Sequence, residues 1–332
     1  MFENSTILVT GGTGSFGQAF VKMTLNSYKP KKIIIFSRDE IKQWEMARDY
    51  HNNKKVRFFI GDVRDRERLY RALKDVDFIA HAAATKIVPT AEYNPFECVK
   101  TNIEGAMNLI DAAIDNKVKK VVALSTDKAS APINLYGATK LVSDKLFIAS
   151  NAYSKKDNTK FSVVRYGNVM GSRGSVIPYF LSIKNRGEFP ITHPDMTRFM
   201  ITLDQGVELV WTAFKDMVGG ETYVKKIPSI KIVDIAKAIA PNIPIKEIGI
   251  RPGEKMHEQM IGEEEADYTF EYESFYKILP QINGWNNDKS RIKDGTKVPK
   301  NFCYNSKLNK EWMALDTLAK WVKKNIHQLE TH

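Results

Sequence analysis

The sequence predicts an α/β fold: a Rossmann-type doubly wound parallel sheet with a smaller mixed α/β lobe. Short apolar runs alternate with longer segments of helical periodicity through the first half of the chain. Runs this apolar suit strands that are covered on both faces, as in a parallel sheet. A glycine-rich segment also follows the first run directly. Strand and helix repeated in this way are typical of a doubly wound sheet.

The strands and helices are expected at the following positions. The apolar runs predicted to form strands are Ile7–Val9, Lys32–Phe36, Val56–Ile60, Asp77–Ala80, Val121–Leu124 and Phe161–Arg165. The helical segments between them include Gln18–Leu25, Glu40–Tyr50 and Asn102–Asn116. The segment Lys307–Leu329 has apolar residues at helical spacing, which predicts a terminal amphipathic helix that serves packing or subunit contact.

The pattern changes after about Gly171, where prolines and glycines become frequent and the expected elements shorten. We therefore predict a first domain over residues 1–170, which carries the cofactor and catalytic residues. Residues 171–332 are predicted to form mainly a second, substrate-binding lobe. Some of its segments are expected to return to the main sheet, and its last element is the terminal helix.

Composition and charge exclude several classes of protein. The 332 residues are 43% hydrophobic and 27% charged, which is typical of a globular chain. The net charge of +11 permits acidic partners, but positive and negative residues alternate, as in Arg64–Arg68. No block of like charge and no aromatic-basic stripe is present, so nucleic-acid binding is not expected.

Cysteine usage and apolar runs bear on the compartment. The two cysteines, Cys98 and Cys303, exclude a disulfide framework and suit a reducing cytoplasm. The N-terminus lacks the basic and apolar regions of a signal peptide, and no apolar run approaches the length of a membrane span. We expect a cytoplasmic protein without membrane contact. No histidine pair or carboxylate cluster has metal-ligand spacing, so no metal is expected.

The glycine-rich segment Thr10–Gly17 predicts a dinucleotide site. It lies between a strand and a helix, where glycines permit a tight turn and close approach of the backbone to a pyrophosphate at the helix N-terminus. The residues expected to contact the cofactor here are Gly11, Thr13, Gly14, Ser15, Phe16 and Gly17.

The end of the second strand indicates which dinucleotide binds. An NAD site places an acid there to bind the ribose 2′-hydroxyl. This chain has Ser37 and Arg38, with Lys42 one helical turn later, which suit the 2′-phosphate of NADP. Asp39 leaves NAD open, although it is also a suitable cap for the following helix. Further contacts are expected at the ends of the third and fourth strands, from Asp62, Val63, Ala82 and Lys86.

Catalytic groups are expected after the fifth strand. Tyr136 and Lys140 are four residues apart and therefore lie on one face of a helix. Such a lysine can bind the nicotinamide ribose and lower the pKa of the tyrosine, so that the phenolate accepts a hydroxyl proton. Thr126, Asp127 and Lys128 follow the strand itself, at the sheet edge where such folds bind ligands.

These motifs resemble the extended short-chain dehydrogenase/reductase superfamily. The segments Ser125–Ala129, Pro132–Lys140, Arg165–Val169 and Arg251–Lys255 resemble, more narrowly, UDP-N-acetylglucosamine 4,6-dehydratases. The likeness is greatest to the short, C5-inverting kind that begins pseudaminic acid synthesis for flagellin glycosylation. It runs from about residue 5 to about residue 265. Relatives form homo-oligomers, so we expect one here.

The resemblance implies a role for each catalytic group. Tyr136 would take the proton of the C4 hydroxyl while hydride passes from C4 to NADP⁺. Lys128 would be the base at C5, Asp127 would protonate the departing C6 hydroxyl, and Thr126 would hydrogen-bond the 4-oxygen. An acid and a base of different pKa are what the elimination of water requires.

The substrate, a UDP-sugar, carries a diphosphate, so basic residues are expected around it. Arg198 and Arg251 would bind phosphate oxygens, Glu254 a ribose hydroxyl, and Thr192 the uridine. The motifs of the family also point to Lys86 and Asn168 as substrate contacts.

Other functions remain open at this stage. A C5-retaining 4,6-dehydratase would carry most of the same motifs, although relatives of that kind tend to have methionine in place of Tyr136. A nucleotide-sugar C4-epimerase would share Tyr136 and Lys140 but would not need Asp127 and Lys128. A catalytically silent NADP-binding regulatory module would need none of these four side chains.

Overall fold

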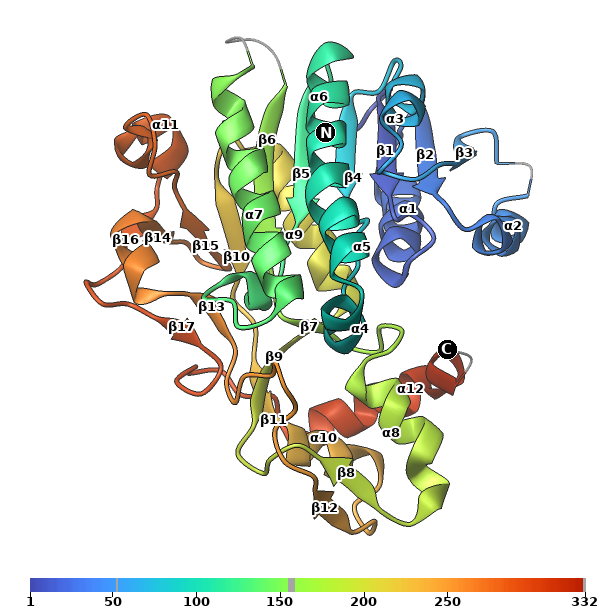
Figure 1. Ribbon diagram of the computed structural model, residues 1–332, viewed down its shortest axis with the longest axis vertical. Coiled ribbons are helices and arrows are strands. Elements are labelled where there is room, and N and C mark those ends of the chain that lie inside the picture. Colours follow the sequence, from blue (N-terminus) through green and yellow to red (C-terminus); the bar gives the residue numbers. More distant parts are fainter. Residues whose placement is uncertain (52, 155–158, 331–332) are drawn as a thin grey trace.

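The computed structural model of the chain describes residues 1–51, 53–154 and 159–330. A central sheet carries helices on both faces, and a smaller lobe lies at one end of it (Figure 1). The strands of the sheet are β1 (Thr6–Thr10), β2 (Lys32–Ser37), β3 (Val56–Ile60), β4 (Phe78–His81), β5 (Lys120–Leu124), β6 (Lys160–Arg165), β10 (Thr222–Lys225), β14 (Thr269–Glu271), β15 (Phe275–Ile278) and β16 (Thr296–Lys297).

The order of the strands indicates where the sheet is expected to bind a ligand. Within the described residues the order is β16-β14-β15-β10-β6-β5-β4-β1-β2-β3. The strands from β3 to β10 are parallel, and β15, β14 and β16 continue the sheet antiparallel. The chain builds outward from β1 to β3 and then returns to β4, so the order reverses between β1 and β4. Ligands of such sheets bind at the carboxyl ends of the strands beside this reversal.

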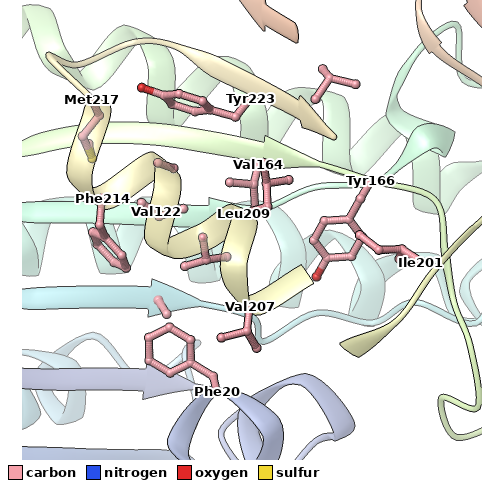
Figure 2. Packing of buried hydrophobic residues seen from close by; sticks show 14 of the residues in the cluster. Phe20, Val122, Val164, Tyr166, Ile201, Val207, Leu209, Phe214, Met217 and Tyr223 are labelled. Atoms are coloured by element: carbon pink, nitrogen blue, oxygen red, sulfur yellow. The ribbon is translucent and has the colours of Figure 1, made fainter. Parts of the chain in front are cut away.

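Two layers of helices bury the apolar faces of the sheet. The helices are α1 (Ser15–Ser27), α2 (Glu40–Asp49), α3 (Arg66–Ala72), α4 (Val88–Tyr93), α5 (Pro95–Val99), α6 (Gly105–Asp115), α7 (Leu135–Ala149) and α9 (Leu203–Asp216). One core cluster joins the sheet to α1 and α9, and a second joins it to α3, α6 and α7. Figure 2 shows the first cluster, in which Phe20 of α1 and Leu209 of α9 pack near Val122 and Val164 of the sheet.

The smaller lobe has its own apolar core. Its elements are β7 (Asn168–Val169), α8 (Val176–Ile183), β8 (Phe189–Ile191), β9 (Thr197–Ile201), β11 (Ser229–Lys231), α10 (Ile232–Ile239), β12 (Ile245–Glu247) and α12 (Leu315–Glu330). A two-stranded sheet of β13 (Gln259–Ile261) and β17 (Tyr304–Asn305) lies beside them, and α11 (Lys289–Ile292) lies near β15.

The expected α/β architecture is confirmed, and all six predicted strands are present. The second half of the chain returns β10, β14, β15 and β16 to the main sheet. The boundary near residue 170 stays a prediction. The expected helix Asn102–Asn116 begins with a π-helical turn, Lys100–Glu104, before α6.

The terminal helix was predicted to begin at Lys307, and this is wrong: α12 begins at Leu315. The residues before it form backbone hydrogen bonds with β11 instead. The amide of Ser229 donates to Glu311 O at 2.9 Å, and the amide of Met313 donates to Ser229 O at 2.8 Å. These tertiary hydrogen bonds satisfy the backbone groups that a helix would have used. In α12, Leu318 and Val322 are buried in the core of the lobe, so the helix does serve packing.

Candidate active site

In the glycine-rich loop between β1 and α1, the glycines carry no side chain that would cover the backbone at the carboxyl ends of the strands. Gly11 has φ of 63°, and a Cβ there would lie 2.9 Å from the backbone nitrogen of Ala83. At Gly17 a Cβ would meet Gly12 at 2.4 Å, so α1 packs closely on the loop. The hydroxyl of Thr10 accepts the amides of Ala82 and Ala83 at 3.1 and 3.2 Å, which fixes the end of β4 beside it. This backbone cradle fits a dinucleotide pyrophosphate.

A cavity of about 790 Å³ extends from this loop towards the smaller lobe. It is lined by nearly all of the residues that the sequence singled out. They are Gly11, Thr13, Gly14, Ser15, Phe16, Gly17, Ser37, Arg38, Lys42, Asp62, Val63, Ala82, Lys86, Thr126, Lys128, Tyr136, Lys140, Asn168, Arg251 and Glu254. Three predicted residues are not in its lining: Asp127, Thr192 and Arg198.

The end of β2 presents the groups expected at a 2′-phosphate. Ser37 and Thr13 share a hydroxyl hydrogen bond of 2.8 Å. The side chain of Arg38 is 66% exposed and lies 3.8 Å from Asp62. Asp39 accepts the amide of Lys42 at 3.0 Å and so caps α2, as one interpretation of the sequence had it. Asp39 also forms an ion pair with Lys42 at 2.6 Å.

Tyr136 and Lys140 lie on the first turns of α7, in the floor of the cavity. The helix begins at Asn134, whose side chain accepts the amide of Gly137 at 2.7 Å. Burial raises the pKa of Tyr136 to about 12, and the charge of Lys128 is the largest influence that lowers it. Burial also lowers the pKa of Lys140, although the nearby carboxylate of Asp144 opposes this. In this structure Lys128, rather than the expected Lys140, is therefore the main cation acting on the phenol.

Asp144 was not singled out from the sequence. Its carboxylate accepts the hydroxyl of Ser125 at 2.5 Å, and its side chain is buried. It lies one helical turn beyond Lys140, which places a buried anion beneath that ammonium group. The i, i+4 spacing was a signal that could have identified it.

Asp127 and Lys128 form a short 3-10 turn after β5. The Nζ atom of Lys128 donates to Asp127 Oδ1 at 3.0 Å, and the hydroxyl of Thr126 donates to the same oxygen at 2.9 Å. Asp127 is fully buried, and burial raises the pKa of its carboxyl group. Burial alone would lower the pKa of Lys128, but the charges of Asp127 and Glu258 outweigh it and raise this pKa.

Glu258 is the functional neighbour that sequence reasoning missed. It is only 2% exposed, and its Oε1 atom lies 3.3 Å from Lys128 Nζ. Arg198 lies on the other side, with its Nε atom 3.8 Å from the same oxygen. Arg198 also donates to the carbonyl groups of Thr197 and Met256. It is thus held behind the Asp127–Lys128 pair, and the structure does not bring it into the lining of the cavity.

The remaining substrate candidates lie together in the smaller lobe. Arg251 and Glu254 form a hydrogen-bonded ion pair, and the Thr192 hydroxyl lies 3.5 Å from Glu254 Oε2. Asn134 donates to the carbonyl of Gly253 at 2.8 Å, which ties this loop to the start of α7. These contacts connect the expected nucleotide residues to the catalytic helix.

Two further candidates line the cavity between the lobes. The Oδ1 atom of Asn168 is buried and has no hydrogen-bond partner among the described residues. A buried acceptor left without a donor is costly, so it fits a site completed by a ligand. Lys86 donates to the carbonyl of Arg173 at 3.2 Å, and burial lowers its pKa.

The described residues contain neither a metal-binding cluster nor a membrane-spanning helix. No group of three or more histidine, cysteine, aspartate or glutamate side chains is arranged to hold a metal ion there. None of the helices in the described ranges is both long and apolar enough to cross a membrane.

Comparison with known proteins identifies the family. Residues 7–280 match the family model described as polysaccharide biosynthesis protein. A UDP-N-acetylglucosamine 4,6-dehydratase (inverting) from Campylobacter jejuni is 54% identical over 94% of this chain and 95% of its own. A UDP-glucose 4-epimerase from Rickettsia bellii is 46% identical over 84% of each chain.

A solved structure extends the likeness to the fold of the whole chain. The crystal structure of Pen from Bacillus thuringiensis has a TM-score of 0.89 and is 37% identical, and the match covers 99% of both chains. The glycine loop, the Tyr136–Lys140 pair and the Asp127–Lys128 pair thus lie in a fold shared along the full length. The chain therefore belongs to the polysaccharide biosynthesis protein family of extended short-chain dehydrogenases/reductases and, within it, to the family of the inverting UDP-N-acetylglucosamine 4,6-dehydratases, which are lyases.

Proposed function

We propose that this protein is an NADP-dependent enzyme that removes water across C5 and C6 of UDP-N-acetylglucosamine and inverts C5. The product is UDP-2-acetamido-2,6-dideoxy-β-L-arabino-hex-4-ulose. The observation that carries the proposal is the hydrogen-bonded Asp127–Lys128 pair, in which Lys128 lines the cavity beside Tyr136 and Asp127 is buried directly behind it. Epimerisation at C4 needs only the redox groups, whereas elimination also needs an acid and a base. The 54% identity to an inverting dehydratase supports the same reaction.

The first step is the oxidation of C4. When bound, NADP⁺ accepts the hydride from C4 and later supplies it to C6. Tyr136 takes the proton of the C4 hydroxyl, and the Lys140 ammonium group holds the nicotinamide ribose. Thr126 hydrogen-bonds the 4-oxygen, and its hydroxyl also lowers the pKa of Tyr136. The 4-ketone so formed acidifies the proton at C5.

The Asp127–Lys128 pair supplies the acid and the base for the elimination of water. Lys128 must be neutral to accept the C5 proton, and its hydrogen bond to Asp127 provides the route for its own proton. Transfer along this bond gives a neutral amine and a protonated carboxyl group. The amine takes the proton from C5, and the carboxyl group gives its proton to the C6 hydroxyl, which leaves as water. With NADP bound, hydride would return to C6, and a solvent-derived proton delivered to C5 on the face opposite Lys128 would give the inverted product.

The cofactor is a nicotinamide dinucleotide, and we propose NADP. The exposed guanidinium of Arg38 and the ammonium of Lys42 lie beside Ser37 at the edge of the cavity. Two cations and a hydroxyl suit a 2′-phosphate. The capping role of Asp39 supports this, because its carboxylate accepts the amide and the ammonium group of Lys42 and so has a structural function of its own.

The nucleotide part of the substrate is assigned to the smaller lobe. We propose that Arg251 binds the diphosphate, Glu254 a ribose hydroxyl and Thr192 the uridine. Lys86 and Asn168 would contact the sugar and its phosphates where the lobes meet. We further propose that the protein acts in the cytoplasm as a homo-oligomer, at the first step of pseudaminic acid synthesis for flagellin glycosylation. Support for this pathway is the resemblance of the catalytic motifs.

Purified protein incubated with UDP-N-acetylglucosamine in deuterium oxide, without added reductant, tests the reaction by NMR. We expect a C6 methyl signal, a 4-keto sugar and deuterium at C5, with couplings that report inversion. The variant Asp127→Asn is the control, because it cannot protonate the C6 hydroxyl. We expect a loss of turnover of about 10²-fold or more in this variant.

The UDP-glucose 4-epimerase relative supports a second candidate, C4-epimerisation of a nucleotide sugar. In the same NMR experiment an epimerase would change the coupling at C4 and would give no methyl signal. It would also keep its activity in the Asp127→Asn variant. Retention instead of inversion at C5 would be read from the same couplings.

A further inference from the structure

Glu258 is a buried carboxylate that lies against the catalytic pair and has no role in the steps above. It belongs to the smaller lobe, on the residue before β13, whereas Asp127 and Lys128 follow β5. Its Oε1 atom is 3.3 Å from Lys128 Nζ, close to the 3.0 Å between Nζ and Asp127 Oδ1. The ammonium group therefore lies between two carboxylates from different parts of the chain.

We propose that Glu258 is a positioning residue for the elimination: it holds Lys128 beside Asp127 and keeps a fixed negative charge behind the pair. The inference rests on the proposed dehydration. The geometry supports this role. A lysine side chain is long and flexible, so a second carboxylate beside the Lys128 ammonium group restricts where that group can lie. Glu258 does not line the cavity, so it acts through Lys128.

The anchoring of Glu258 supports a fixed position. The amide of Glu258 donates to Ser306 Oγ at 2.9 Å, and the amide of Ser306 donates to Glu258 O at 2.8 Å. Ser306 also shares a hydroxyl hydrogen bond of 2.7 Å with Thr197. The Glu258–Ser306 contact extends the antiparallel pairing of β13 and β17 by one residue at its end. The C-terminal segment, for which the sequence indicated no chemical role, thus holds Glu258 under the catalytic lysine.

The charges around Glu258 keep it ionised. Lys128, Arg198 and Lys255 lower its pKa and together outweigh burial, which would raise it. The Nζ atom of Lys255 itself donates to Ser130 O at 2.7 Å. With Glu258 negative, ionisation of Asp127 is less favourable and protonation of Lys128 is more favourable.

Other titratable groups face the pair from the main domain. Tyr136 of α7 is influenced by the charges of both Asp127 and Lys128. Arg165 of β6 is influenced by Asp127 and is itself paired with Glu265 at 3.0 Å. None of these groups changes in the experiment below, so a shift in pH dependence reports the removed charge.

Both effects of Glu258 favour the elimination. Asp127 retains the proton that the C6 hydroxyl needs, and Lys128, once neutral, is a stronger base towards C5. The pair exchanges its proton internally, so the pKa values measured by kinetics belong to the pair as a whole. Removing the charge of Glu258 should lower both of them.

The test is the variant Glu258→Gln, which keeps the shape of the side chain and removes its charge. The acid limb of kcat against pH reports the base and the alkaline limb reports the acid. Both limbs should move to lower pH by about one unit or more, because a full charge at this distance is removed from a buried site. Glu258→Asp keeps the charge and should give a smaller shift in the same direction.

The matched control is Glu221→Gln, a buried glutamate at the start of β10, away from the catalytic edge. Its carboxylate accepts the Ser162 hydroxyl at 2.8 Å and the amides of Val218 and Gly219. This variant should lose stability and keep the wild-type pH profile. If Glu258→Gln behaves in the same way, Glu258 is only structural and the inference fails.

A second measurement needs no substrate and so separates this inference from the proposed function. The isotope-labelled carboxyl group of Asp127 is titrated by NMR in the protein alone, with Asp127→Asn used to identify its signal. In Glu258→Gln and, less strongly, in Glu258→Asp, this titration should move to lower pH. An unmoved titration overturns the inference, whether or not the wild-type protein dehydrates UDP-N-acetylglucosamine.

Discussion

At the level of single residues, the chemistry of the site depends on how burial and neighbouring charges oppose each other. Burial raises the pKa of Asp127, which favours the protonated form of this carboxyl group. Burial also raises the pKa of Tyr136 to about 12, so its phenol needs nearby cations before it can act as a base. The surroundings of Asp127 and Tyr136 thus shift the pKa of each group and suit one to act as an acid and the other as a base.

Arg38 is expected to set the preference for NADP. The variant Arg38→Ala should raise the KM for NADP by about 10-fold or more, because a hydrogen bond to a charged group contributes roughly 1.5–3 kcal/mol. The KM for NAD should change little, since NAD has no 2′-phosphate. Steady-state kinetics with both cofactors measure this preference. Equal losses with NAD and NADP would contradict the assignment.

His81 is expected to make stability depend on pH. It is buried at the end of β4, and burial lowers its pKa from 6.5 to about 3. In the unfolded chain this histidine is protonated below about pH 6.5, whereas in the folded protein it stays neutral down to about pH 3. The free energy of unfolding therefore decreases as the pH falls from about 6.5 to about 3. The slope contributed by this group is about 1.4 kcal/mol per pH unit. Above this range, His81 makes no pH-dependent contribution.

Urea unfolding at a series of pH values measures this slope. The variant His81→Asn removes the titrating group and keeps an acceptor for the Thr10 hydroxyl, which lies 2.8 Å from the histidine Nδ1. We expect a shallower dependence on pH in the variant. Identical slopes in the two proteins would show that another group is responsible.

At the level of elements, the close packing of α7 on the turn Asp127–Ala129 brings the proposed catalytic residues together. Gly137 makes this approach possible, because a Cβ at this position would lie 2.1 Å from the carbonyl oxygen of Lys128. The same turn of helix carries Tyr136. Loop residue and helix residue are therefore held in one rigid unit.

Replacing Gly137 with alanine should force α7 away from the turn. We expect a loss of at least about 1–3 kcal/mol in the free energy of unfolding, as overpacking of a buried contact typically costs, together with loss of turnover. Thermal melts and the dehydration assay measure the two effects. The control is Gly206→Ala in α9, where the nearest atom to a Cβ is 3.7 Å away. This control should be neutral or slightly stabilising, since alanine favours helix.

At the level of the whole molecule, exposed apolar side chains support the proposed homo-oligomer. Phe96 is 79% exposed, Met107 50% and Val142 42%, on α5, α6 and α7 respectively. These helices contact one another and lie on the same face of the sheet (Figure 1). Exposed apolar side chains on neighbouring helices are a feature of many protein interfaces.

Light scattering should therefore give a mass above that of one chain, and Met107→Glu should lower it. Burying a charge in place of an apolar side chain should weaken association by about 10-fold or more. Ile41→Glu is the control, because Ile41 is 64% exposed on α2, outside this cluster of helices. A monomeric wild-type protein would refute the prediction.

The sequence alone determined six strands and the local motifs, because these depend on neighbours along the chain. Continuous apolar runs identified six strands, and the glycine pattern after the first of them identified a loop that lines the cavity. The four-residue spacing of Tyr136 and Lys140 placed them on one helix face. The sequence failed at the start of α12, where hydrogen bonds to Ser229 replaced the helical ones.

Only the tertiary structure decided which distant charges share the buried site. Glu258 is 130 residues beyond Lys128 in the chain, and nothing in its local sequence marks it, yet it lies 3.3 Å from that ammonium group. Arg198 was expected to bind a phosphate group, but its guanidinium group forms an ion pair with Glu258 instead. The energy of a buried charge depends on every group within a few ångströms, so its role is fixed only when folding brings those groups together.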